Sequence, residues 1–283
     1  MEIVVGKLSG FCFGVNNAIT KAEEKLKDEK EIFCLGELIH NKQVVDKLEK
    51  MGMKTIEKIK DLPDKSELII RAHGVAPYIY NLLEEKKIKI FDFTCPKVLK
   101  IHEEVSKAKK DNYIFLIGEK NHPEVIGTIG FSGKDSFIIQ TKEDIDDAIA
   151  KLKESYFKKI YIVAQTTFSV QKFDEFIQEI EEKLKGYIIT INKSICDSTK
   201  LRQEETKKIS QDVEFMIIVG GKNSSNTRKL YDIAKENCPS IHIQTKEDLN
   251  LEEIKKYQKI GITAGASTPK EYIEEIVKVL ERD

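Results

Sequence analysis

Residues 2–26, EIVVGKLSGFCFGVNNAITKAEEKL, read as a short apolar strand, a turn that carries Cys12, and an amphipathic helix. The same order of strand, cysteine and helix recurs in two later stretches, 88–108 (IKIFDFTCPKVLKIHEEVSKA) and 187–209 (YIITINKSICDSTKLRQEETKKI). Each copy places a cysteine where a strand becomes a helix. A repeat of roughly 80 to 100 residues is too long for a solenoid and predicts similar small lobes.

Two further turn types recur in every copy, each following an apolar strand and preceding a helix. One type lies in 32–50 (IFCLGELIHNKQVVDKLEK), 113–130 (YIFLIGEKNHPEVIGTIG) and 215–236 (FMIIVGGKNSSNTRKLYDIAKE). The other lies in 67–83 (ELIIRAHGVAPYIYNLL), 159–180 (KIYIVAQTTFSVQKFDEFIQEI) and 259–280 (KIGITAGASTPKEYIEEIVKVL). Short apolar strands that alternate with amphipathic helices are typical of parallel sheets covered by helices.

We therefore predict an α/β protein of three pseudo-symmetric lobes with parallel sheets, arranged as a trefoil around a common centre. The expected lobes are 13–95, 96–195 and 196–283. The third lobe lacks its final strand unless the strand in 1–12 supplies it. Since ligands of parallel sheets bind beyond the carboxyl ends of the strands, all nine turns should contribute to one pocket.

Composition excludes several classes of protein. The 283 residues hold 47 Lys and Arg against 48 Asp and Glu, so no overall charge favours nucleic acid or an anionic membrane. The N-terminus reads directly into a strand without a secretory signal, and no apolar run approaches the roughly 20 residues of a membrane span. Five dispersed cysteines argue against a disulfide framework. A cytoplasmic protein with thiols as ligands or nucleophiles is the expectation.

Cys12, Cys95 and Cys196 occupy the same position in the repeat. Three thiolates around one point suit a single [4Fe–4S] cluster whose fourth iron is left for substrate. Helix N-termini lower thiol pKa values, which favours the thiolate that iron requires. Zinc is the competing metal, although the close CxxC pairs usual in zinc sites are absent. Cys34 and Cys238 fall outside the repeat position and are interpreted as a buried small hydrophobe and a loop thiol.

The turns also carry groups suited to a diphosphate. Imidazolium donors are expected at three turn histidines, whereas the other two, His102 and His242, are interpreted as satisfied core or surface residues. Hydroxyls and amides at glycine-rich turns can cradle phosphate oxygens, although such turns also occur as plain helix caps. The predicted diphosphate-binding residues are His40, His73, His122, Ser224, Ser225, Asn226 and Ser267.

Glu124 and Thr166 are the candidate proton handlers. A glutamate directly after His-Pro could equally complement a helix dipole. To deliver a proton near neutrality, Glu124 would need its pKa raised above about 4.3, or a relay through a neighbouring hydroxyl.

The ordered motifs GFCFGV, GELIHN, RAHGV, DFTCP, GEKNHPEV, AQTTFS, ICDST, GGKNSSNT and TAGASTP closely resemble the LytB-type hydroxymethylbutenyl diphosphate reductases across nearly the whole chain. The resemblance implies that the three cysteines hold the cluster, that the seven residues above surround the diphosphate, and that Glu124 and Thr166 deliver protons. It also implies an allylic diphosphate substrate, its two-electron reductive dehydroxylation to isopentenyl and dimethylallyl diphosphates, and a ferredoxin or flavodoxin as electron donor.

Two other functions stay open on the residues alone. A metal-dependent phosphohydrolase could use the same histidines and hydroxyls, but it would need no reductant and would release inorganic phosphate. A non-enzymatic iron–sulfur electron carrier or redox sensor would explain the cysteines but would leave the predicted pocket unused.

Overall fold

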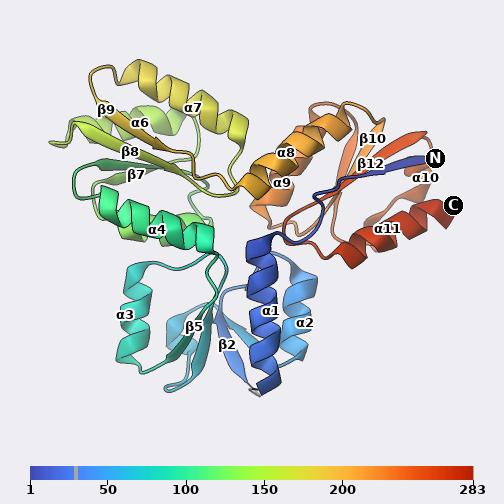
Figure 1. The fold of residues 1–283 in the computed structure, drawn as a ribbon, viewed down its shortest axis with the longest axis horizontal. Helices are drawn as coiled ribbons and strands as arrows, with labels where there is room; N and C mark the ends of the chain where they lie inside the picture. Colours follow the sequence, from blue (N-terminus) through green and yellow to red (C-terminus); the bar gives the residue numbers. More distant parts are fainter. Residues whose placement is uncertain (29–30, 283) are drawn as a thin grey trace. The chain divides into compact units, whose positions relative to one another are not determined.

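The computed structural model describes residues 1–28 and 31–282 and contains three four-stranded parallel sheets with helices between the strands (Figure 1). The predicted α/β class with parallel sheets is therefore confirmed. The strands are β1 (Glu2–Val5), β2 (Ile32–Leu35), β3 (Met53–Ile56), β4 (Glu67–Ile70), β5 (Lys89–Asp92), β6 (Tyr113–Ile117), β7 (Ser136–Ile139), β8 (Lys159–Ala164), β9 (Ile188–Asn192), β10 (Phe215–Val219), β11 (Ser240–Ile243) and β12 (Lys259–Ala264). The helices are α1 (Phe13–Asp28), α2 (Lys42–Lys50), α3 (Pro77–Glu85), α4 (Pro96–Ala108), α5 (Pro123–Ser132), α6 (Glu143–Lys153), α7 (Val170–Lys183), α8 (Asp197–Ser210), α9 (Ser225–Lys235), α10 (Leu251–Ile254) and α11 (Lys270–Arg282), with 3₁₀ turns at Ile59–Asp61 and Lys246–Asp248.

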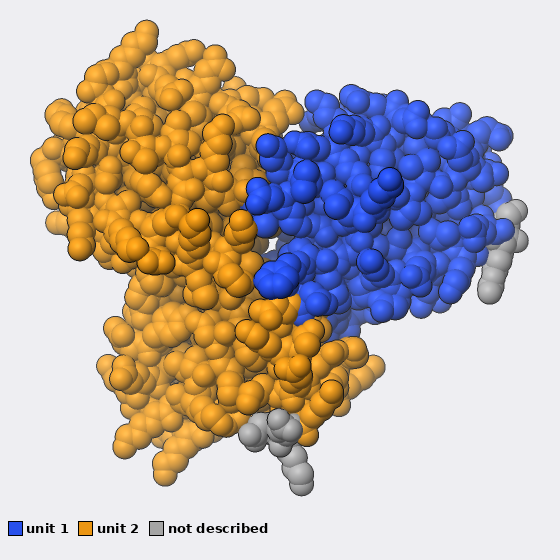
Figure 2. Space-filling model, in the orientation of Figure 1, with its two compact units in different colours: residues 1–16, 39–45, 196–283 blue, residues 17–38, 46–195 orange. Residues whose placement is uncertain are grey.

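The described chain forms two compact units (Figure 2). The first, unit 1, joins residues 1–16, 39–45 and 196–283, and the second, unit 2, joins 17–38 and 46–195. The predicted division into three lobes at residues 95 and 195 stays a prediction.

Unit 2 contains two of the sheets, with strand orders β3-β2-β4-β5 and β7-β6-β8-β9. Of the central strands, β2 (IFCL) and β6 (YIFLI) are buried along their whole length, and β4 and β8 are buried over most of theirs. Continuous apolar runs of this kind are typical of strands covered by helices on both faces. On one face of the second sheet, Phe115 and Ile162 pack against Phe173 of α7, and on the other face Ile114 packs against Val105 of α4.

Unit 1 contains the third sheet, whose strand order is β1-β12-β10-β11. The N-terminal strand β1 pairs in parallel with β12, with Val4 opposite Gly261. Ile217 and Ile262 at the centre of the sheet pack against Ile276 of α11. The first strand of the chain thus completes the sheet built from its last segment.

The sequence repeat did not single out one strand in each sheet, namely β3, β7 and β11, which lie at sheet edges. Each has four residues, and only one of the four is buried. An edge strand is covered on fewer sides, so it lacks the continuous apolar run by which its neighbours could be recognised.

The sheets place the nine recurrent turns after the carboxyl ends of their strands, where helix N-termini begin. The turn after β4 carries His73, the turn after β8 carries Thr166, and the turn after β10 carries Ser224. Of the helices in the described residues, none has the length and apolar character of a membrane span.

Candidate active site

Glu124 and Thr166 form a buried hydrogen-bonded pair in unit 2. The Thr166 backbone N–H donates to Oε1 of Glu124 at 2.6 Å, and the Thr166 hydroxyl donates to Oε2 at 2.6 Å. Glu124 lies in the first turn of α5 and Thr166 in the turn after β8, so β6 and β8, which are neighbours in the sheet, bring them together. Only 3% of Glu124 and 7% of Thr166 is exposed.

Burial makes the Glu124 carboxyl a weak acid. It raises the pKa of Glu124 to about 7, although the two hydrogen bonds from Thr166 act in the opposite direction. A carboxyl with this pKa is partly protonated at neutrality and can donate its proton there. The structure therefore supplies the raised pKa that the sequence could only state as a requirement.

His122 caps the N-terminus of α5 with its side chain. The backbone N–H of Glu124 donates to Nδ1 of His122 at 3.2 Å, and Pro123 occupies the first helical position, where no N–H is needed. Since Nδ1 accepts this bond, a proton on the ring resides on Nε2. The imidazolium expected at His122 stays a prediction; in the neutral ring, this cap leaves Nε2 as the donor nitrogen.

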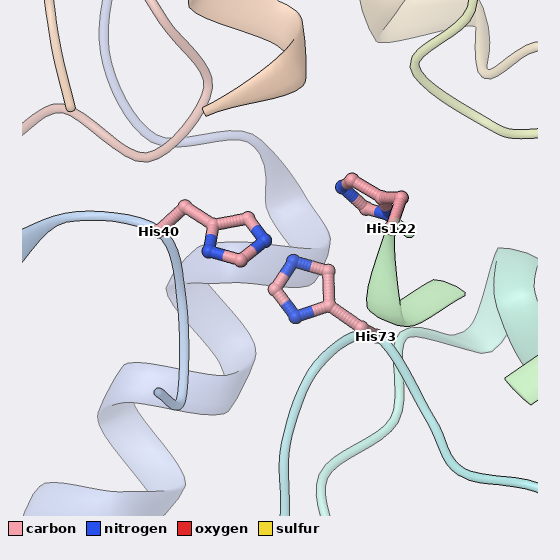
Figure 3. Close-up of side chains that lie close together, drawn as sticks. All are labelled: His40, His73 and His122. Atoms are coloured by element: carbon pink, nitrogen blue, oxygen red, sulfur yellow. The ribbon is translucent and has the colours of Figure 1, made fainter. Parts of the chain in front are cut away.

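His73 lies beside His122 in unit 2, and their ring centroids are 5.4 Å apart in an edge-to-face arrangement (Figure 3). His73 belongs to the turn after β4, in which Gly74 adopts a φ of +72°. A Cβ at Gly74 would stand 2.7 Å from Cε1 of His102, so the turn packs closely on α4. Glycine is required there both by the left-handed backbone and by this contact.

Cys95 is the N-cap residue of α4 in unit 2. Its backbone N–H donates to the carbonyl of Ala72 at 3.0 Å, and Pro96, the next residue, is the first residue of the helix. The hydrogen bond ties the cysteine to the same turn that carries His73. The thiol is half-buried.

Cys12 and Cys196 belong to unit 1 and are half-buried thiols at helix starts. Cys196 is the N-cap of α8, and Cys12 directly precedes α1. The Cys12 N–H donates to the carbonyl of Ala266 at 3.1 Å, in the turn after β12. All three cysteines therefore directly precede a helix.

The start of α9 in unit 1 collects buried polar side chains. Ser224 is its N-cap and accepts from the Thr227 N–H at 3.3 Å, which leaves its hydroxyl proton to donate elsewhere. Asn226 is 4% exposed, and neither Oδ1 nor Nδ2 has a hydrogen-bond partner among the described residues. Buried amides are normally hydrogen-bonded, so this one indicates a polar ligand at the N-terminus of α9.

His40 and Ser267 approach the same turn of unit 1. The Ser267 hydroxyl donates to the His40 carbonyl at 3.2 Å, and a Cβ at Gly221 would stand only 2.5 Å from that carbonyl oxygen. Glycine at 221 therefore lets the segment of His40 lie against the GGKNSSN turn. The predicted residues Ser224, Ser225, Asn226, Ser267 and His40 all belong to unit 1.

A family model described as LytB protein matches residues 3–281. The chain belongs to the LytB family. It is 42% identical over 283 residues to the 4-hydroxy-3-methylbut-2-enyl diphosphate reductase of Clostridioides difficile (strain 630), covering 99% of each chain. It is 40% identical over 283 residues to the enzyme of the same name from Aquifex aeolicus (strain VF5), covering 98% of this chain and 94% of that one.

Solved structures of the LytB type agree with the fold. The E-1-hydroxy-2-methyl-but-2-enyl-4-diphosphate reductase from Plasmodium falciparum matches with a TM-score of 0.92 and 36% identity, over 99% of this chain and 87% of that one. A structure of (E)-4-hydroxy-3-methyl-but-2-enyl diphosphate reductase, described as the terminal enzyme of the non-mevalonate pathway, matches with a TM-score of 0.70 and 38% identity over 100% of both chains.

The structure revises the interpretation of one histidine of this LytB-family chain. His102 is buried in α4 and stacks on Phe131 with centroids 4.3 Å apart, but neither ring nitrogen has a hydrogen-bond partner among the described residues. Burial lowers its pKa to about 4, so the ring is neutral. The expectation of a satisfied residue is therefore wrong for His102, whereas Nε2 of His242 lies 3.0 Å from the Gly220 carbonyl.

Sequence reasoning missed two buried residues beside the site. Gln165 accepts from the Glu119 N–H at 2.9 Å and donates to the Thr167 hydroxyl at 2.8 Å, which fixes the turn that carries Thr166. Gln165 lies in the AQTT motif, and this motif is the sequence signal from which it could have been identified. Arg202 of α8 is 4% exposed in unit 1, and no motif or repeat position marked it.

Proposed function

We propose that the chain is a 4-hydroxy-3-methylbut-2-enyl diphosphate reductase. The observation that carries the proposal is the buried Glu124–Thr166 pair in a chain that matches reductases of this name over 99% of its length. The reaction removes the terminal hydroxyl of an allylic alcohol. It breaks a C–O bond, takes up two electrons and two protons, releases water, and gives isopentenyl and dimethylallyl diphosphates.

The cysteines fit an iron–sulfur cluster by the chemistry of their donor atoms. Soft thiolates are the ligands that such clusters take, and the three cysteine thiols all lie at helix starts. We assign Cys12, Cys95 and Cys196 as the ligands of one [4Fe–4S] cluster. When bound, it supplies electrons one at a time and a Lewis-acidic iron without a protein ligand.

The polar residues of unit 1 suit the diphosphate. Ser224 and Ser225 begin α9, and its N-terminus carries the partial positive charge that favours phosphate oxygens. The unpartnered amide of Asn226 offers both a donor and an acceptor there. His40 and Ser267 complete the set from unit 1, and we assign His73 and His122 of unit 2 to the same substrate, with Nε2–H of His122 as a neutral donor.

Glu124 delivers the proton that turns the leaving hydroxide into water. Its raised pKa keeps a fraction of the carboxyl protonated at neutral pH, which a general acid requires. Thr166 orients the carboxyl through both of its hydrogen bonds and can pass a proton through its hydroxyl. A ferredoxin or flavodoxin is the proposed electron donor.

Anaerobic purification, followed by iron analysis and turnover with a chemical reductant, tests the proposal. We expect about four irons per chain for a [4Fe–4S] cluster and two isomeric C5 diphosphates as products. Release of inorganic phosphate without reductant would instead identify a phosphohydrolase. An iron-loaded protein that leaves the allylic diphosphate unchanged would identify an electron carrier.

A pair of cysteine variants tests the ligand assignment. Cys95→Ser should lose the cluster and turnover, because serine is a poor ligand for these irons. Cys238→Ser is the matched control, since Cys238 is half-buried but lies in the loop before β11, away from a helix start. Full iron content in Cys95→Ser would overturn the assignment.

A further inference from the structure

Arg202 is a buried cation in unit 1, six residues along the chain from Cys196. Nη2 donates to the Gly10 carbonyl at 2.6 Å, and Nη1 donates to the carbonyl of Ser198 at 3.3 Å and to its hydroxyl. The guanidinium therefore joins the first turn of α8, which Cys196 begins, to the segment that leads into Cys12.

The hydrogen bonds of Arg202 do not neutralise its charge. Two carbonyls and a hydroxyl accept from it, and none of these groups is ionised. A buried charge without a counter-charge costs several kcal/mol or more, so a partner of opposite sign is expected nearby. Nε is also buried and has no hydrogen-bond partner among the described residues, so this donor too lacks an acceptor.

The groups that Arg202 contacts, at Gly10 and Ser198, lie two residues from Cys12 and two residues from Cys196. Burial lowers the pKa of Arg202, and the thiolates of Cys12 and Cys196 are the strongest effects that oppose this lowering, ahead of the Glu205 carboxylate. Glu205 is engaged elsewhere, because its two oxygens accept from the backbone N–H groups of Lys7 and Leu8 at 2.9 and 3.1 Å.

Arg202 and Glu205, both on α8, thus each bind the segment that precedes Cys12. Glu205 binds residues 7 and 8, and Arg202 binds residue 10, while Ala266 accepts from Cys12 itself. The segment that presents one thiol is thereby fixed to the helix that presents the other. A lysine could supply the positive charge, but it lacks the planar guanidinium with several N–H donors.

We propose that Arg202 is a positioning residue for the cluster: it fixes the Cys12 segment to α8, balances the charge of the Cys12 and Cys196 thiolates, and offers its buried, unpartnered Nε–H to a sulfur atom. The inference rests on the proposed function, because the sulfur acceptor belongs to a cluster that these thiolates hold. Reduction adds negative charge to such a cluster, and a nearby cation with an N–H···S hydrogen bond stabilises the reduced form. Arg202 therefore raises the reduction potential.

The test compares Arg202→Met and Arg202→Gln, which remove the charge, with Arg202→Lys, which retains it. Lys200→Met is the matched control, because it removes one positive charge from an exposed position of the same helix. Each protein is reconstituted anaerobically, and three quantities are measured: iron per chain, the midpoint potential of the cluster, and the rate of iron transfer to a chelator. Urea unfolding of the metal-free proteins reports whether each variant folds.

We expect reduction of the cluster to become about tenfold less favourable in Arg202→Met and Arg202→Gln, a shift of about 59 mV toward negative potential for one electron. Iron loss should be about tenfold faster in both variants. Arg202→Lys should recover the potential but still lose iron faster than wild type, because it lacks the fork of donors. Lys200→Met should match wild type.

A midpoint potential and an iron-release rate equal to those of wild type in a folded, loaded Arg202→Met or Arg202→Gln would overturn the inference. Where Arg202→Met does not fold, Arg202→Gln decides, since its amide can still donate to the Gly10 carbonyl. Failure of the proposed function is a different result, in which wild type itself binds no iron.

Discussion

At the scale of single residues, the proposed chemistry depends on the protonation of Glu124. Neither oxygen faces a cation that would favour the charged form; both instead accept hydrogen bonds from Thr166. Desolvation outweighs those bonds, so the pKa rises to about 7. Acid strength at this position is therefore set by burial and adjusted by one threonine.

Glu124→Gln should reduce turnover by roughly 10²–10⁴-fold while leaving substrate affinity nearly unchanged, because the amide fills the same space but donates no proton to the leaving group. In wild type, the turnover step limited by proton delivery should slow as pH rises through about 7, since the acid form is lost. Steady-state assays between pH 6 and 9 measure both effects. Near-normal turnover of the variant would remove Glu124 from the mechanism.

The same carboxyl should make folding stability depend on pH. Below its ordinary pKa of about 4.3 the group is protonated in both states, and above about 7 it is ionised in both. Stability therefore falls as pH rises between these values, by roughly 3 to 4 kcal/mol in total. Glu124→Gln lacks this loss. In urea unfolding of the metal-free proteins, the free energy of unfolding of the variant should rise relative to that of wild type from pH 4 to 8. Parallel pH profiles of the two free energies would contradict the raised pKa.

Thr166→Val should raise the pKa of Glu124 further. The variant removes the hydroxyl that donates to Oε2 and keeps the backbone N–H that donates to Oε1, and both bonds favour the ionised form. The falling limb of the pH–rate profile should move to higher pH. Thr166→Ser retains the hydroxyl and should leave the limb in place. A limb that moves in neither variant would show that another group sets it.

Single residues were predicted from the sequence where a repeat position marked them. The cysteines and turn residues stood out because three copies could be compared, and Glu124 followed from its turn motif. The contact between Glu124 and Thr166 joins residues 42 apart and depends on the register of β6 and β8, which no local pattern encodes. The contacts of Arg202 and the missing hydrogen-bond partners of the His102 nitrogens also depend on tertiary structure, so the repeat did not indicate them.

At the scale of single elements, the start of α5 combines capping and chemistry. His122 caps the helix through Nδ1, and the N–H that it accepts from is that of Glu124, the proposed acid. The cap thus fixes the tautomer of one site residue and the backbone of another.

Two substitutions at His122 separate these roles. Asparagine is a good N-cap residue but has no Nε2–H, so His122→Asn should keep the stability of the protein and lose affinity for the diphosphate. His122→Ala should lose the same affinity and also about 1 kcal/mol of stability. Substrate titration and urea unfolding of the two variants test the difference. Equal unfolding free energies in both would show that the cap contributes nothing.

Elements were predictable to the extent that their burial was continuous. The central strands β6 and β10 are buried at every residue and stood out as apolar runs, as did the helices that follow them. The edge strands β3, β7 and β11 have one buried residue each and were missed. Their pairing depends on a neighbouring strand rather than on their own composition.

At the scale of the whole molecule, both ends of the chain belong to one sheet. β1 pairs with β12, although more than 250 residues separate them. The need for such a strand could be inferred from counting strands in the repeat, because the last copy is one short. Its register could not, since four residues of which none is fully buried fit β12 in more than one way.

The pairing of β1 with β12 can be tested by proline at two adjacent positions. Glu2 N–H donates to Gln258 and Gly6 N–H to Ile262, both at 2.8 Å, so the two-residue repeat of a strand directs the Val4 N–H toward β12 and the Val5 N–H toward the open edge. Val4→Pro should cost about 1 kcal/mol or more for the lost bond and should speed amide hydrogen exchange in residues 259–264, whereas Val5→Pro should leave that exchange close to wild type. Both prolines impose the same φ, so the difference between them reports the lost hydrogen bond together with the packing of the half-buried Val4 side chain. Because β1 leads through the segment held by Arg202 and Glu205 into Cys12, Val4→Pro should also lower the iron content, and equal exchange and iron content in the two variants would contradict the pairing.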